Sequence, residues 1–238
     1  MNAGYYFILF AVVLLGGMIA HRFPLTRRHT VDYFLSFSAA FLFGIVAVHL
    51  IPLVGKSDNP YIGVCILLGF LIQIALETLT QGAEHCHEHR ASSTRFLPLI
   101  TGLLIHAFLE GLPLDFYSDI EVHQAPHTPI NSLFWGILIH KFPAAYTLGT
   151  LLSGMSLRGT KYYLPLILFA LATPLGAALP HFIPLSKDLQ LVTISIVIGF
   201  MLHIATSILY EMDKEHHSRD LKKGGLILLG MGLAALSA

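Results

Sequence analysis

The chain has 238 residues, of which 55% are hydrophobic and only 12% are charged, and its mean hydropathy is +0.70. A soluble domain carries about twice that charged fraction, so the composition excludes an ordinary soluble enzyme or binding module. The 14 basic residues balance 14 acidic ones, and this neutral total gives no indication of a nucleic-acid partner.

Apolar stretches divide the chain into eight candidate membrane spans, because a spanning helix needs about 20 mostly apolar residues. The connections between them are short, so residues 1–238 are predicted to form a single all-α, polytopic membrane domain. The last stretch is short for a full span. The predicted spans are 4–20, 33–53, 61–80, 96–115, 131–155, 162–180, 189–210 and 224–238.

Basic residues in the loops predict the orientation, because short cytoplasmic loops hold the excess of Lys and Arg. The second and sixth loops carry only Lys56 and Lys187, and the fourth carries none. The odd-numbered loops carry the rest, which places both termini outside: Arg22, Arg27, Arg28, Arg90, Arg95, Arg158, Lys161, Lys214, Arg219, Lys222 and Lys223.

Ionisable residues occur in the second and third spans and in the loop that follows the third. His49 lies near the outer end of the second span and Glu77 near the inner end of the third. The next loop holds three histidines within five residues, and short His-rich tracts bind metal ions. The loop is therefore a candidate metal acceptor or sensor on the cytoplasmic side, although a solvated polar turn explains it as well: His85, His87 and His89.

The fourth span carries His106 and Glu110, four residues apart and therefore on one helix face. Ionisable groups at bilayer depth cost roughly 2.5–3.5 kcal/mol each on insertion scales, and they commonly mark an ion or proton path. Imidazole with carboxylate suits zinc, iron and similar divalent metals. The alternative is a hydrogen-bonded His–Glu pair that holds two helices together.

The fifth span carries a second ionisable pair, His140 and Lys141, followed by Pro143. A proline at that position frees backbone carbonyls that can face a cavity. Asp115, at the outer end of the fourth span, and His203, deep in the seventh, are further candidates for an ion path, together with His49 and Glu77. Interfacial anchoring explains His49 and Asp115 about as well, and interhelical hydrogen bonding explains Glu77 and His203.

Four motifs in chain order resemble those of the Zrt/Irt-like (ZIP) metal-ion transporters. The second span ends in His49-Leu-Ile-Pro52, and the fourth contains His106-Ala-Phe-Leu-Glu110-Gly111. The fifth contains His140-Lys-Phe-Pro-Ala144, and the sixth contains Ala172-Thr-Pro-Leu-Gly176. The resemblance implies eight spans with both termini outside. It also implies that helices one, four, five and six move as a unit against the other four.

Family members often hold two adjacent metal ions, and this sequence departs from that pattern. Ala107, Lys141, Ala144 and Thr173 stand where the family's second-site ligands are expected. The resemblance therefore implies one metal site, formed by His106, Glu110 and His140, with the Lys141 ammonium in the second position, offsetting the charge of Glu110.

The predicted function is transport of a divalent metal ion, zinc first, into the cytoplasm. The metal is cargo, and no cofactor, enzyme activity or nucleic-acid partner is expected. Two alternatives stay open: a proton pathway that zinc inhibits, and an intramembrane metalloenzyme, although no span contains His-Glu-x-x-His. Short loops favour a bacterial inner membrane. The oligomeric state is open, with a homodimer as one candidate.

Overall fold

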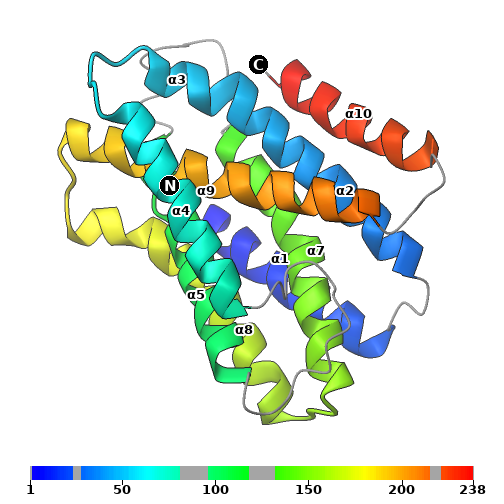
Figure 1. The fold of residues 1–238 in the computed structure, drawn as a ribbon. Helices are drawn as coiled ribbons and strands as arrows, with labels where there is room; N and C mark the ends of the chain where they lie inside the picture. The colour runs from blue at the N-terminus through cyan, green and yellow to red at the C-terminus, as the bar shows by residue number, and fades with distance from the viewer. Residues whose placement is uncertain (1, 24–27, 81–95, 118–131, 215–220, 238) are drawn as a thin grey trace.

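A computed structural model describes residues 2–23, 28–80, 96–117, 132–214 and 221–237, and within these ranges every regular element is a helix (Figure 1). Residues 114–117 continue in helical conformation beyond α5. The helices are α1 (Ala3–Arg22), α2 (Arg28–Ile45), η1 (Val46–Leu50), α3 (Ile51–Gly55), α4 (Ile62–Thr80), α5 (Phe96–Gly111), α7 (Ser132–Gly154), α8 (Thr160–Phe182), α9 (Lys187–Lys214) and α10 (Leu221–Leu236).

Each of the eight predicted spans corresponds to a helix in the described residues, which confirms the all-α polytopic membrane fold. The second span is built from α2, η1 and α3 in succession. Helix ends differ from the predicted ones by a few residues, as frayed termini allow. The seventh helix, for example, continues to Lys214 rather than ending at residue 210.

Length and hydropathy alone identify five helical stretches in the described residues as able to cross a membrane. α4 contributes a shorter apolar stretch, Ile62–Thr78, and α10 has 16 residues. α7 has 23 residues but is not among the five, because His140 and Lys141 lower its hydropathy. Fourteen of its residues are buried, against five of the 20 in α1, so α7 is an interior helix. The five stretches are Ala3–Arg22, Val31–Gly55, Phe96–Tyr117, Thr160–Phe182 and Lys187–Tyr210.

The second span contains one wide helical turn, the π-helix η1. Pro52 is the second residue after it, and in a regular α-helix the proline ring would collide with the carbonyl of Val48. The wider turn accommodates the proline and places His49 against α10, where its Nε2 lies 3.0 Å from the Ala234 carbonyl oxygen. Such turns are frequent at functional sites.

The helices form two groups. The first body comprises α1, α5, α7 and α8, and the second body comprises α2 with η1 and α3, α4, α9 and α10 (Figure 1). The most extensive packing lies inside a body: α1 on α7 and α5 on α8 in the first, α4 on α9 and α10 on α2 in the second. The bodies meet mainly where α2 packs on α7 and α4 packs on α5.

Glycines bring the helices within each body into backbone contact. A Cβ on Gly69 of α4 would overlap the Ile196 carbonyl of α9, and one on Gly199 of α9 would overlap the Ile66 carbonyl of α4. At the interface between the bodies, Gly136 of α7 faces only side-chain atoms, at 3.5 Å or more. Such glycines therefore let the helices within each body pack closely against one another, as small residues do in membrane proteins. Further close approaches within one body are made by Gly16, Gly17, Gly44, Gly111, Gly149, Gly176 and Gly230.

Candidate metal site in the membrane

Four ionisable side chains of the first body lie close together, on the side that faces the second body. α5 carries His106 and Glu110 on one face, and the facing part of α7 carries His140 and Lys141. Each is at most 3% exposed, and Lys141 is among the largest fully buried side chains. Charged groups are almost never buried to this degree unless they are paired, so the cluster is held by its own mutual contacts.

Glu110 is the centre of the cluster. The Lys141 Nζ lies 2.6 Å from Glu110 Oε2, which makes an interhelical ion pair between α7 and α5. The His106 Nε2 lies 3.6 Å from the same carboxylate oxygen, across one helical turn. The Lys141 ammonium also lies 4.7 Å from the ring centre of Phe169 on α8, within cation–π range.

A small pocket joins His106 to His140. Its other walls are the apolar side chains of Leu35, Leu103, Ala144, Leu148, Leu151 and Phe169. The structure therefore brings the three predicted ligands into one region. Across the described residues, however, no three His, Cys, Asp or Glu side chains already stand as a ready-made metal site. The Glu110 carboxylate contacts the Lys141 ammonium and the His106 imidazole.

Aromatic contact links the cluster to the second body. The His106 ring stacks on Phe200 of α9, with centroids 5.1 Å apart and planes inclined by 15°. Phe200 is 1% exposed, so one face of the imidazole packs against a buried aromatic ring of the second body. Phe200 could not be identified from the sequence, since a phenylalanine in an apolar span is indistinguishable from an ordinary core residue.

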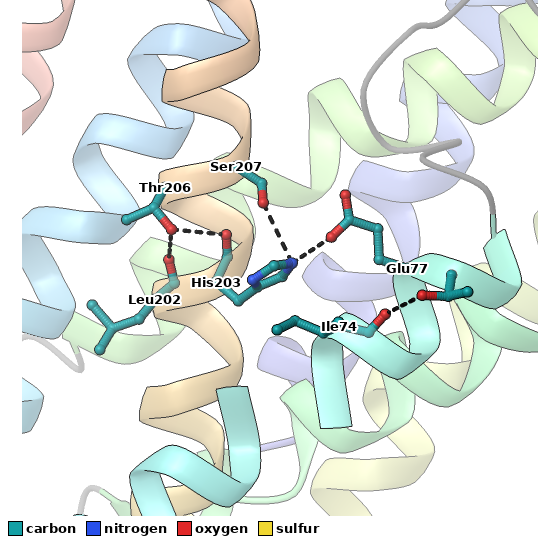
Figure 2. Close-up of polar contacts among 7 residues, drawn as sticks. Ile74, Glu77, Leu202, His203, Thr206 and Ser207 are labelled. Carbon is teal, nitrogen blue, oxygen red and sulfur yellow. Dashed lines mark hydrogen bonds and ion pairs between the residues drawn. The ribbon is translucent and has the colours of Figure 1, made fainter. Parts of the chain in front are cut away.

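Glu77 and His203, predicted as candidate path residues, lie together between α4 and α9 (Figure 2). The His203 Nε2 contacts Glu77 Oε2, and the Ser207 hydroxyl lies 3.3 Å from the same nitrogen. Phe70 packs edge-on against the imidazole at 4.8 Å. This geometry corresponds to the interhelical hydrogen bonding that was the alternative reading. A role in the ion path stays a prediction.

Asp115 and His49 are each held by an interhelical contact. Asp115 Oδ1 lies 3.2 Å from His181 Nε2 on α8, and the Tyr6 hydroxyl of α1 lies 3.2 Å from that same nitrogen. His49 contacts α10, through the Ala234 carbonyl oxygen and the Ser237 hydroxyl. The sequence reasoning did not single out His181, although a histidine at the end of the sixth span was a visible signal.

The His-rich loop lies outside the described residues. The prediction that His85, His87 and His89 form an inner metal acceptor or sensor therefore stays a prediction.

Comparison with known proteins gives a family match over residues 77–238, to the model described as ZIP zinc transporter. This range holds the four residues of the buried cluster. The chain is 30% identical over 137 residues to zinc transporter ZIP9-B of Xenopus laevis, covering 55% of this chain and 42% of that protein. It is 28% identical over 147 residues to zinc transporter ZIP9 of Micropogonias undulatus, covering 56% of this chain and 44% of that protein. The matches thus span less than half the length of these relatives.

Proposed function

Because the chain belongs to the ZIP zinc transporter family, we propose that it carries a divalent metal ion, zinc first, into the cytoplasm through one intramembrane site on α5 and α7. The family is one of transporters and not of enzymes. The metalloenzyme alternative is accordingly set aside.

One observation carries the proposal: a carboxylate, an ammonium and two imidazoles are at most 3% exposed inside an apolar helical bundle. Ionisable side chains in membrane helices are costly and mark substrate or ion pathways. His106 and Glu110 share one helix face, and His140 shares a pocket with His106. Their nitrogen and oxygen donors match zinc, and three protein ligands leave a coordination position for water, which suits an ion that must be released.

Lys141 adjusts the charge of this site. Its ammonium pairs with Glu110, so the buried pair has no net charge. A divalent ion must compete with the ammonium for the same carboxylate oxygen. This competition weakens metal binding. After the metal leaves, the ammonium neutralises Glu110 again, which avoids the cost of a buried carboxylate without a partner.

The position of the pocket supports release toward the cytoplasm. Leu148 and Leu151 follow His140 toward the end of α7, and Leu103 precedes His106 on α5. The loop charges assign these halves of α5 and α7 to the cytoplasmic side. The pocket thus lies on the cytoplasmic side of the two histidines, which supports release of the metal in that direction.

Transport by motion of one body against the other fits the packing. The glycine contacts join helices within a body, whereas α2 and α7 meet at Gly136 through side chains alone. The first body holds the four ionisable residues, so it would carry the metal past the second. Such an elevator-like step agrees with what the family resemblance implies.

The chain is an integral membrane protein, and the kind of membrane stays a proposal. The relatives named above are from a frog and a fish, and they lend no support to the bacterial inner membrane that the short loops favoured. A homodimer likewise stays a prediction.

Uptake of labelled zinc into proteoliposomes tests the function. We expect saturable uptake by the parent protein, abolished by His106→Ala and by Glu110→Ala at matched protein level. His181→Ala is the matched control, because His181 is half-exposed and lies at the far end of α8, and uptake should persist. If the parent carries no zinc and zinc instead blocks a proton current, the proton pathway replaces the transporter.

A further inference from the structure

The Lys141 ammonium has two neighbours of different chemistry. It is ion-paired with Glu110 on α5, and it also faces the ring of Phe169 on α8. Phe169 lines the pocket that His106 and His140 share, so the ring lies at the border between the ammonium and the space a metal would enter. A desolvated ring face attracts a cation without consuming a hydrogen-bond acceptor.

Thr173 lies one turn beyond Phe169 on the same face of α8. It is 1% exposed, and its Oγ1 has no hydrogen-bond partner among the described residues. Its backbone carbonyl closely approaches Gly111, the residue that follows Glu110, so α8 places this hydroxyl beside the turn that carries the carboxylate. A buried hydroxyl without a partner is uncommon, because leaving it so costs stability.

We propose that the charged Lys141 side chain has a second resting position, formed by the Phe169 ring and the Thr173 hydroxyl oxygen, which it occupies when a divalent metal takes Glu110. This inference rests on the proposed function. The ammonium cannot keep its 2.6 Å contact when a metal ion binds the same oxygen, and at 1% exposure it needs another partner inside the bundle. The second position supplies a π-face, whose ring already lies 4.7 Å from the ammonium, and an acceptor one helical turn further along α8.

Phe169 and Thr173 then determine metal affinity without contacting the metal. Before the metal binds, the ammonium pairs with Glu110. When the metal is bound, the Phe169 ring and the Thr173 hydroxyl stabilise the ammonium instead, so the buried site can hold both cations. The inference also assigns a role to Thr173, which stands where the family pattern expects a glutamate and whose hydroxyl is otherwise unused.

Zinc binding to the purified protein, measured by titration calorimetry in detergent beside uptake in proteoliposomes, tests the inference. We expect Phe169→Leu and Thr173→Val each to weaken zinc binding, Phe169→Leu by roughly tenfold. Phe169→Tyr and Thr173→Ser retain the ring and the hydroxyl, and should retain the parent affinity. Phe41→Leu and Thr150→Val make the same changes at positions remote from Lys141 and serve as controls.

The deciding comparison repeats Phe169→Leu and Thr173→Val in a Lys141→Gln background. If both substitutions act through the Lys141 ammonium, neither one changes the zinc affinity of the Lys141→Gln protein by more than about twofold. Equal losses with and without Lys141 would show a packing effect and overturn the inference, as would unchanged affinity in the original background. A parent protein that neither binds nor carries zinc would refute the proposed function itself, and the inference with it.

Discussion

Removing the Glu110 charge should destabilise the protein more than removing both charges of the Glu110–Lys141 pair. At 2.6 Å, the Coulomb attraction between the two groups is about 6 kcal/mol for an effective dielectric constant of about 20. Desolvation of both groups offsets much of this attraction. The Glu110→Gln variant keeps that desolvation for Lys141 and loses the attraction, so we expect a loss of about 3–5 kcal/mol in the free energy of unfolding.

The double variant Glu110→Gln, Lys141→Met replaces the pair with an amide and an apolar side chain of similar length. It should recover most of the lost stability, because no uncompensated charge remains in the interior. Asp115→Asn is the control: it neutralises a carboxylate whose partner, His181, is half-exposed, and it should cost less than about 1 kcal/mol.

Reversible unfolding in mixed micelles of increasing SDS content, with a chelator present and helicity followed by circular dichroism, measures these differences. The reasoning is refuted if Glu110→Gln unfolds at the parent's midpoint, or if the double variant is as unstable as the single one. The second result would mean that Glu110 contributes through its shape or its contact with His106 and not through its pairing with Lys141.

Three further predictions concern the two bodies. Gly199→Ala should destabilise by about 1–3 kcal/mol in the same unfolding assay, because its Cβ would overlap the Ile66 carbonyl, whereas Gly136→Ala should change stability by less than about 0.5 kcal/mol. A thiol crosslink between Ile45→Cys and Gly136→Cys joins α2 to α7 and should stop zinc uptake; uptake that survives complete crosslinking would contradict motion between the bodies. His49→Ala should cost about 1 kcal/mol through the lost contact with α10, and an unchanged unfolding midpoint would show that this contact is not stabilising.

The sequence was sufficient to predict the eight helices and the residues that could form a site. A run of about 20 apolar residues has one stable solution in a bilayer, because the backbone must satisfy its own hydrogen bonds there. Within such runs, residues such as Glu110 and Lys141 stand out because their burial is costly. The hydropathy of a segment and the ionisable residues within it are properties of the local sequence, so packing against neighbouring helices does not change them.

Only the tertiary structure decided which of these residues meet. The pairing of Lys141 with Glu110 was implied only by the family resemblance, and nothing in the sequence indicated that Glu77 pairs with His203, because each contact joins helices whose rotation and height are set by packing. The contacts of Phe169 and Phe200 could not be predicted for a related reason. The sequence of an apolar span does not indicate whether an aromatic residue in it contacts lipid, other core residues or a cation. Side-chain identity is fixed along the chain, but the chemistry of a buried charge depends on what the other helices place within a few ångströms of it.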